Sequence, residues 1–378
     1  MAAFFSGAAM RVCDGMLPRI GSDFGLTPGA AGGVILFFSV AYGLSQMVFG
    51  PLGDRFGKAR LVCFGLLACM VMALVAAASA DFSLLLLTRA AWGMAAAGII
   101  PMSMAWIGDA VPYEDRQATL ARLLMGILTG MMSGQLLGGL FADAQAGWRG
   151  AFVLMAIGYG LIGFLLLRRL RGIAAAEPAT GRGTAMFVVQ LRAVLSQPWS
   201  GWVLGAAFAE GLLLLGPLAF LPAYLNQRYG LTLAAASGLL ALYAVGGLVY
   251  ALFARRIVMT LGESRMVRVG SVLMGAGFLC WWLSPWAWTA GVVALAVGFG
   301  TYLFHNTLQT HATQMTPAAR GTAVSVFASC LFLGQAAGVA LAGYAFDHLG
   351  HAALLVVPAL GLPLAGWLFA RAVQRRAS

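Results

Sequence analysis

Several ionisable side chains stand inside long apolar stretches of this sequence. Asp14 and Arg11 are three residues apart, so in a helix they share one face and are able to pair. Glu210 is the only acidic residue inside an apolar stretch of the second half. A carboxylate in such surroundings can take up and release a proton, which makes Asp14 and Glu210 candidate proton carriers. The alternative is that both are structural, with Arg11 and Asp14 merely neutralising each other.

Arg89 and a polar group in the second half are further candidates. An arginine in the middle of a membrane span costs at least about 2.5–3.5 kcal/mol, so Arg89 must face a wet cavity or a carboxylate unless it lies near the outer end. His305, Asn306 and Gln309 are close together, and His305 and Gln309 share a helix face. We expect the three to line a cavity, although a lone polar residue would more often join helices. His311 lies off that face, so no metal site is expected.

The apolar stretches that carry these residues indicate membrane-spanning helices. Of 378 residues, 61% are hydrophobic and 9% are charged, against roughly 25% charged in an ordinary soluble domain. A span needs about 20 mostly apolar residues, and strands of a membrane barrel would alternate, whereas stretches 34–49 and 84–107 are apolar all round. We therefore predict an all-α integral membrane protein of twelve transmembrane helices: 2–22, 32–49, 60–80, 83–108, 119–142, 151–168, 199–222, 234–254, 267–284, 287–310, 321–344 and 353–371.

The basic residues are distributed unevenly among the loops between these spans. Eighteen of the 23 lie in one alternate set of loops and in the tail, and three, Arg19, Arg149 and Arg228, lie in the other set. Because cytoplasmic loops carry the excess of Lys and Arg, both termini and the central loop are expected in the cytoplasm, in a bacterial-type inner (plasma) membrane. The net charge of +11 does not indicate nucleic-acid binding, since no contiguous basic face exists. The sequence begins almost inside its first span, which is compatible with a few missing cytoplasmic residues.

The chain divides into two related halves. The long polar stretch 172–197 is expected to be a cytoplasmic central loop between six-helix bundles at 1–171 and 198–378, because Glu177-Pro178 and nearby glycines oppose a helix. Gly57 corresponds to Gly262 at an offset of 205. Arg116 corresponds to Arg320 at an offset of 204, and Ser133-Gly134-Gln135 corresponds to Leu333-Gly334-Gln335 at an offset of 200. Three matches in chain order indicate an internal repeat.

The loop after the second expected span concentrates charge and glycine in the run Gly50-Pro51-Leu52-Gly53-Asp54-Arg55-Phe56-Gly57-Lys58-Ala59-Arg60. It resembles the loop between spans two and three of major facilitator superfamily transporters. The resemblance implies two six-helix bundles related by an axis along the membrane normal, with the substrate between them near the midplane. It also implies a conformational latch in which Asp54 lies near the start of span eleven and Asp109 pairs with a motif arginine. The latch residues would be Gly50, Gly53, Asp54, Arg55, Gly57, Lys58, Arg60 and Asp109. The alternative is a solvated loop that only sets orientation.

Three further runs resemble the drug:proton antiporters and sugar efflux permeases of this superfamily. The run Asp14-Gly15-Met16-Leu17-Pro18 is similar to the Asp-x-x-Leu-Pro pattern of span one. Arg89 with the glycines and proline after it is similar to the span-four pattern associated with proton coupling. Span five resembles Gly-x-x-x-Gly-Pro-x-x-Gly-Gly, with Gln135 in place of the proline. Small residues there allow close helix packing, and the helix-packing set is Gly130, Gly134, Gln135, Gly138, Gly139, Gly334 and Gln335.

These resemblances imply a secondary active transporter for proton-coupled efflux of drugs, sugars or metabolites. The sequence holds no Gly-x-x-x-x-Gly-Lys-Ser/Thr loop, so ATP hydrolysis is not expected to supply the energy. We expect no enzyme activity, no cofactor and no nucleic-acid partner. The expected partners are a small-molecule substrate, protons and the lipid bilayer, and the expected state is a monomer.

One alternative is a proton-coupled or facilitative importer of a polar metabolite, which would need a richer polar cavity. The other is a non-transporting sensor or scaffold on the same fold.

Overall fold

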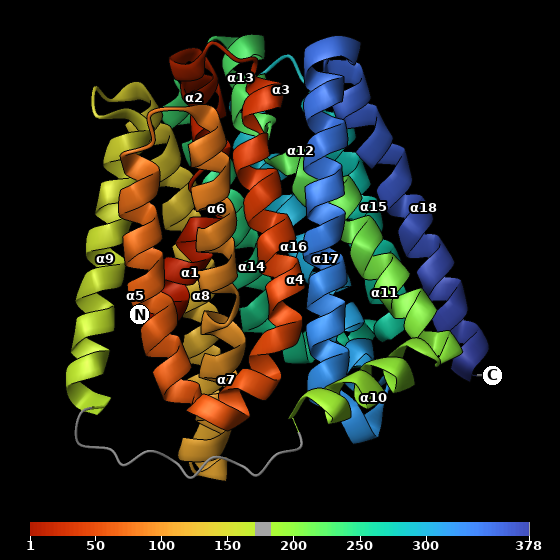
Figure 1. Cartoon of the computed structure of the whole chain (residues 1–378). Coiled ribbons are helices and arrows are strands. Elements are labelled where there is room, and N and C mark those ends of the chain that lie inside the picture. The colour runs from red at the N-terminus through yellow and green to blue at the C-terminus, as the bar shows by residue number, and fades with distance from the viewer. Residues whose placement is uncertain (171–182, 378) are drawn as a thin grey trace.

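The computed structural model of the chain describes residues 1–170 and 183–377, and these form helices joined by short turns, with no strand. Figure 1 shows the long helices running side by side between two ends of the molecule. The first half contains α1 (Ala2–Arg11), η1 (Asp14–Met16), α2 (Leu17–Phe24), α3 (Pro28–Ala31), α4 (Gly33–Phe56), α5 (Lys58–Ala77), α6 (Phe82–Ala97), α7 (Ile99–Ala110), α8 (Tyr113–Asp143) and α9 (Gly147–Leu170).

The second half repeats this order after a short extra helix, α10. It contains α10 (Gly183–Leu195), α11 (Pro198–Glu210), η2 (Gly211–Leu215), α12 (Gly216–Leu218), α13 (Leu221–Tyr229), α14 (Leu233–Leu261), α15 (Glu263–Leu283), α16 (Thr289–Gln314), η3 (Pro317–Ala319), α17 (Arg320–Tyr344), η4 (Ala345–Leu349) and α18 (His351–Ala377). We call the end with α10 and the turns at Gly57 and Gly262 the basic end, because those loops carry most of the Lys and Arg residues.

Eleven helices within the described ranges are long and apolar enough to cross a membrane, so the predicted count of twelve is not reproduced. The difference is the first expected span, 2–22, which is divided among α1, η1 and α2. The division falls where the sequence opposes a regular helix. Pro18 lies in the first turn of α2 and has no N–H to donate to the carbonyl of Asp14. The seventh expected span is interrupted in the same way, by the π-helical turn η2 and by Pro217 and Pro222.

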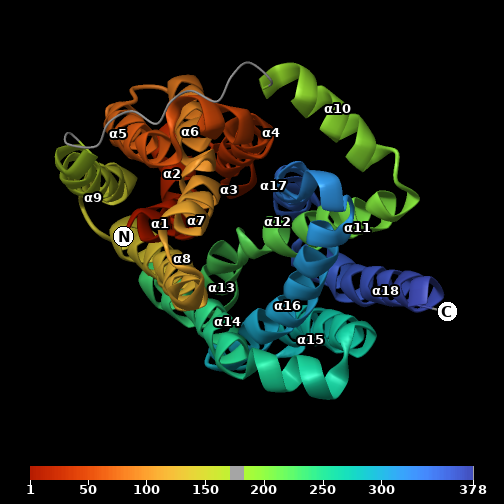
Figure 2. The ribbon, with the colours of Figure 1, turned by 90° about the horizontal axis from the view of Figure 1, so that it is seen from below.

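The two halves lie side by side, as the view along the helices shows (Figure 2). Within the first half α1 packs on α8 and α5 on α9, and the equivalent pairs in the second half are η2 and α11 on α17 and α15 on α18. The halves meet along two helix pairs, α4 with α17 and α8 with α14. This arrangement creates an inner zone to which α1, η1, α8, α12 and α14 contribute.

Glycines on α8 and α17 let the first helix of each half approach closely. A Cβ on Gly130 or Gly134 would meet the carbonyl oxygen of Phe4 or Ala8. In the second half, Gly334 and Gly338 face the carbonyl oxygens of Phe208 and Leu212 in the same way. Small residues permit this contact between backbones. Gly138 extends the first row and lies against the carbonyl of Val12, whereas Gly139 faces Leu233 and Ser237 of the other half.

These contacts correct the predicted pairing of the two glycine motifs. Gly134 matches Gly338, at an offset of 204, and not Gly334, at an offset of 200. The predicted pairing is therefore wrong by four residues, or about one helical turn. The glycines recur every four residues in both helices, so a shift of one turn still aligns glycine with glycine.

The expected central loop, 172–197, is in part helical. Residues 172–182 lie outside the described residues, and Gly183–Leu195 forms α10. The helix follows the Glu177-Pro178 break, and no proline or glycine interrupts 184–195. Thr322 of α17 donates a hydrogen bond to Gln190 Oε1 at 2.6 Å. In Figure 1, α10 lies across the basic end, close in height to the C-terminus.

Candidate functional site

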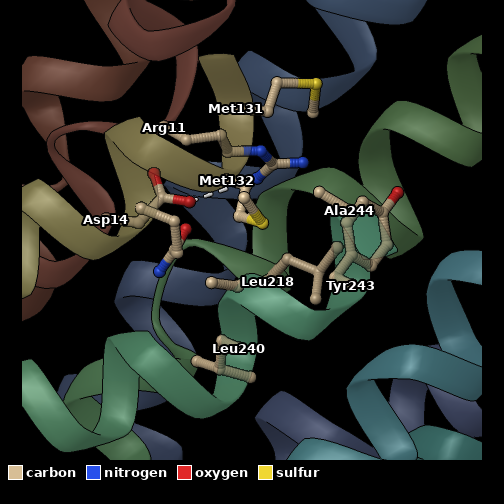
Figure 3. Close-up of a pocket in the computed structure, with 10 residues that line it drawn as sticks. Arg11, Asp14, Met131, Met132, Leu218, Leu240, Tyr243 and Ala244 are labelled. Atoms are coloured by element: carbon tan, nitrogen blue, oxygen red, sulfur yellow. Dashed lines mark hydrogen bonds and ion pairs between the residues drawn. The ribbon is translucent and has the colours of Figure 1, made fainter. Parts of the chain in front are cut away.

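A narrow hollow of about 20 Å³, enough for roughly one water molecule in this conformation, lies between the two halves. Figure 3 shows side chains of both halves around it. The first half contributes Arg11, Asp14, Met131, Met132 and Gln135, and the second half contributes Leu218, Leu240, Ala241, Tyr243 and Ala244. A molecule bound here would touch both halves at once.

Arg11 and Asp14 form an ion pair at the wall of this hollow. Arg11 Nη1 donates to Asp14 Oδ2 at 3.2 Å, and the Asp14 side chain is 1% exposed. The guanidinium also lies 5.8 Å from the centre of the Tyr243 ring, across the boundary between the halves. Asp14 Oδ1 has no hydrogen-bond partner among the described residues. The pair is therefore buried, reaches the second half and retains an acceptor for a further donor.

The rest of the wall is mostly apolar. Met131 and Met132 face the hollow from α8, and Leu218 and Leu240 face it from the second half (Figure 3). Methionine side chains are flexible and polarizable, so such a wall adapts to apolar molecules of different shape. Gln135 and Tyr243 are the remaining lining side chains with hydrogen-bonding groups, and Gln135 Nε2 has no partner among the described residues. The wall suits an apolar or amphipathic molecule held by a few polar contacts.

Glu210 and His305 form a second buried pair, within the second half. His305 Nδ1 lies 3.0 Å from Glu210 Oε2, and the side chains are 21% and 1% exposed. Glu210 ends α11 directly before the π-helical turn η2, a type of irregularity that is frequent at functional sites. Sequence reasoning named the two residues as separate candidates, and the structure brings them together. Asn306 and Gln309 are half-buried on the same helix and do not line the hollow between the halves.

Arg89 is buried in the first half among aromatic rings. Its guanidinium carbon lies 4.3 Å from the Phe38 ring centre and 4.8 Å from that of Trp92. Its Nε donates to the carbonyl oxygen of Val34 at 3.2 Å, and its Nη1 has no partner among the described residues. The sequence predicted a wet cavity or a carboxylate for this charge unless it lay near the outer end. The structure provides ring faces and a backbone carbonyl, and the guanidinium also interacts electrostatically with the Asp14 carboxyl.

At the basic end, the loop motif joins α4 to α5 through Gly57, whose φ of 86° favours glycine. Lys58 Nζ forms an ion pair with Asp109 Oδ2 at the end of α7. The resemblance implied an arginine as the partner of Asp109, whereas this pair uses the motif lysine. Arg55 is exposed, with its guanidinium 5.2 Å from the Phe56 ring centre. The side chain of Asp54 lies outside the described residues, so its predicted place near span eleven stays a prediction.

Two carboxylates join the halves at the end opposite the basic end, and sequence reasoning missed both. Asp143, at the end of α8, accepts from the backbone N–H groups of Leu233 at 3.3 Å and Ala234 at 2.8 Å, in the first turn of α14. Asp347, in η4 after α17, accepts from the N–H of Gly29 at 3.0 Å and from the hydroxyl of Thr27, at the start of α3. Each carboxylate thus caps a helix of the other half, and we call these contacts the inter-half caps.

The internal repeat contained a signal for these caps. Asp143 and Asp347 differ by 204 positions, close to the offsets that relate the halves. Thr27 and Thr232 differ by 205, and each accepts a hydrogen bond from the N–H three residues on. Threonine at such a position is a typical helix N-cap. An acidic residue recurring at the repeat offset, opposite a recurring N-cap, therefore predicts a symmetric contact between the halves.

Comparison with known proteins agrees with this architecture. The family model described as Major Facilitator Superfamily matches residues 1–339. The chain is 28% identical over 375 residues to the "Probable transporter SCO4007" of Streptomyces coelicolor, covering 93% of this chain and 81% of that protein. It is 30% identical over 134 residues to the "Quinolone resistance protein NorA" of Staphylococcus aureus, 34% of each chain.

A solved structure has the same fold. The crystal structure of a D-xylose-proton symporter superposes with a TM-score of 0.75, at 14% identity, over 98% of this chain and 94% of that one. The family model covers most of the sequence, and the helices it matches are those that surround the hollow between the halves. This chain is a multi-pass membrane protein that belongs to the major facilitator superfamily, a family of transporters and not of enzymes.

Proposed function

We propose that this transporter is a proton-coupled efflux carrier that works by alternating access, and that the narrow hollow between the halves widens during the cycle to form its substrate site. The observation that carries the proposal is the buried Arg11–Asp14 pair, which lines the hollow and lies against Tyr243 of the second half. A carboxylate at this position can exchange its arginine partner for a proton, or for a cationic substrate. Protonation and substrate binding would then compete for Asp14. Such competition is what a carrier needs to exchange protons for substrate across the membrane.

Glu210 and His305 supply a second proton site in this proposal. Both groups are titratable, and they lie within hydrogen-bonding distance in the second half, beside the irregular turn η2. A proton shared by the pair would change how tightly α11 and α16 are held together. Asp14 and Glu210 would thus give each half one buried carboxylate.

The character of the wall supports apolar or amphipathic substrates. Two methionines, two leucines and a tyrosine face the hollow, whereas an importer of a polar metabolite would need more hydrogen-bonding groups. The relative NorA is named as a quinolone resistance protein, and its matched segment supports efflux of compounds of that kind. We take the compounds exported to be organic molecules with a large apolar surface and one basic or polar group.

The proposal is tested with purified protein in proteoliposomes under an imposed pH gradient, with a panel of amphipathic cations, quinolones and sugars. The wild-type protein should accumulate members of the first two classes against their gradient when the pH gradient is present. Asp14→Asn and Glu210→Gln should lose accumulation and keep substrate counterflow, because the neutral amides imitate a protonated carboxyl in size.

Asp115→Asn and Glu114→Gln are the matched controls, since they make the same chemical changes at exposed positions at the start of α8. Both controls should accumulate substrate as the wild type does. If Asp14→Asn, Glu210→Gln and the double variant all retain accumulation driven by the pH gradient, the proposed coupling is wrong. Accumulation of sugars alone would contradict the proposed preference for apolar or amphipathic compounds.

A further inference from the structure

A second hollow lies at the basic end, between the start of α11 and the last turns of α18. Figure 2 shows that α10, the start of α11 and α18 lie away from the boundary between the halves. Its lining residues come from these two helices and the residue before α11. We call it the basic hollow, and it is lined by Gln197, Pro198, Trp199, Trp202, Leu368, Arg371, Ala372, Arg375 and Arg376. It therefore belongs to the second half alone.

Three arginines give the basic hollow a strong positive charge. Arg371, Arg375 and Arg376 all line it, and no carboxylate is among its described lining residues. Glu263 is close in the structure but pairs with His311 at 3.3 Å. Guanidinium groups bind phosphate well, because their donors match its oxygen atoms in pairs. The charge of the hollow therefore favours an anion with phosphate chemistry.

Tryptophan rings hold two of these guanidinium groups at the rim. The Arg371 guanidinium carbon lies 3.5 Å from the Trp367 ring centre, and that of Arg376 lies 4.7 Å from the Trp199 ring centre. Trp202 is 48% exposed beside them. The indole N–H of Trp199 has no hydrogen-bond partner among the described residues. Tryptophan is typical of the membrane–water interface, where one side of the ring contacts lipid.

The position of α10 places the basic hollow at the headgroup level of the bilayer. This helix ends two residues before the hollow begins, and it exposes Val188, Val189 and Leu195. A helix that lies across the basic end with exposed apolar residues is expected to rest in the interface. Figure 1 shows α10 and the C-terminal end of α18 at nearly the same height. The arginines of α18 are then level with lipid phosphates, and Leu368 is on the side of the acyl chains.

We propose that the basic hollow binds the phosphate headgroup of an anionic phospholipid from the leaflet at the basic end. Arg371 and Arg376 would hold the phosphate oxygens, and Trp202 and Leu368 would contact the upper part of the acyl chains. Basic pockets between transmembrane helices on the cytoplasmic side are suited to such lipids. A lipid at this position would join α11, which carries Glu210, to α18.

The proposal is tested by native mass spectrometry of the full chain in detergent, with phosphatidylglycerol or phosphatidylcholine added. The wild-type protein should retain phosphatidylglycerol in preference to phosphatidylcholine. Arg371→Gln/Arg376→Gln should weaken phosphatidylglycerol binding roughly 30-fold, since each basic residue near anionic lipid contributes about a factor of five. Arg168→Gln/Arg169→Gln is the matched control, because it removes the same charge from exposed positions at the basic end of α9.

The control variant should bind phosphatidylglycerol as the wild type does. The proposal is wrong if the Arg371→Gln/Arg376→Gln variant binds phosphatidylglycerol as tightly as the wild type. It is also wrong if the control loses as much affinity as this variant, because the lipid would then respond to the total positive charge of the basic end. Inorganic phosphate at the lipid concentration should not displace phosphatidylglycerol. Displacement would show a free-anion site and would also overturn the proposal.

A folding defect is separated from a binding defect by a charge-conserving variant. Arg371→Lys/Arg376→Lys keeps the charge and loses the paired donors, so it should bind phosphatidylglycerol more weakly than the wild type and more tightly than the glutamine variant. Thermal unfolding in phosphatidylcholine alone should be the same for all variants, whereas phosphatidylglycerol should raise the melting temperature of the wild type most. Phosphatidylglycerol that raises the melting temperatures of the wild type and the glutamine variant equally would overturn the proposal.

Discussion

Arg11 and Asp14 illustrate how a buried charge depends on its partner. The two side chains are 7% and 1% exposed, so neither is well solvated by water. Removing one partner of a buried ion pair typically costs about 3–5 kcal/mol, because the other charge remains without compensation. Replacing both partners is far less costly. The pair is therefore suited to a cycle in which a proton or a cation replaces the arginine at Asp14.

Substitutions of this pair should be strongly non-additive. We expect Arg11→Gln to lower the melting temperature of the purified protein in detergent, because it leaves Asp14 without its cation. The double variant Arg11→Gln/Asp14→Asn should recover most of the loss. Thermal unfolding of the wild type, Arg11→Gln, Asp14→Asn and the double variant gives the coupling energy between the two side chains. A double variant whose loss of stability equals the sum of the two single losses would contradict a functional pair.

At this scale the sequence predicted contacts between neighbours in the chain and missed those between distant segments. A spacing of three residues predicted the pairing of Arg11 with Asp14, because helix geometry alone decides it. Glu210 and His305 are 95 residues apart, and nothing local relates them. The aromatic rings around Arg89 were not predicted, since ring faces brought together by folding leave no pattern in the sequence.

At the scale of the helices, the inter-half caps hold one end of the molecule together. Asp143 and Asp347 each place a negative charge at the N-terminus of a helix in the other half, where the helix dipole is positive. A charge at such a position is worth about 0.3–1 kcal/mol at an exposed site. Two contacts of this size are weak enough to break during each transport cycle.

Neutralising both caps should therefore favour separation of the halves at this end. We expect Asp143→Asn/Asp347→Asn to shift the ratio of closed to open molecules roughly 3- to 30-fold, the change that two contacts of this strength imply. Spin labels on Ala146 and Trp288, one in each half at this end, should report a larger population at long distance.

Asp81→Asn is the control for the caps. Asp81 accepts from the N–H of Leu84 at 2.8 Å, so it caps α6 within its own half. Its loss should lower stability without changing the distance between the labels. A shift of equal size in the control, or no shift in the Asp143→Asn/Asp347→Asn variant, would show that the caps do not set the opening of this end.

The glycines of α8 provide a separate prediction at the same scale. Gly134→Ala should destabilise the protein by about 1–3 kcal/mol, because its Cβ would meet the backbone carbonyl of Ala8 and force α1 away from α8. Gly126→Ala on the same helix should be tolerated, since its nearest neighbour there is 3.9 Å away. Melting temperatures of the two variants should differ clearly, and equal values would contradict close packing of α1 on α8.

The sequence predicted the positions of these helices well, but it predicted the alignment of the two repeats less well. Runs of apolar residues mark the spans, and their polar or glycine ends mark the turns, as at Gly57 and Gly262. The pairing of the repeats was shifted by four residues, because glycines at a spacing of four match themselves after one turn. The division of the first span at Asp14 and the helix α10 were also missed. Both had a local signal in the sequence, which is Pro18 for the division and the run 184–195 without proline or glycine for α10.

For the whole molecule, the distribution of basic residues predicts the orientation in the membrane. We expect the basic end to face the cytoplasm. In a cysteine-free variant, Thr260→Cys at the basic end should be protected from an impermeant thiol reagent applied to intact cells, and Ala146→Cys at the opposite end should be labelled. The reverse labelling pattern would invert the topology and the leaflet assigned to the basic hollow.

We propose that substrate and proton compete for Asp14, the buried carboxylate that lines the hollow, and that Glu210 is a second proton site. The most direct measurement is proton release when a transported compound binds to the purified protein in weakly buffered detergent, followed with a pH-sensitive dye. The wild type should release protons on binding, and the Asp14→Asn/Glu210→Gln variant should bind the compound without releasing any. Saturating binding to the wild type with no proton release across the pH range of transport would contradict the account.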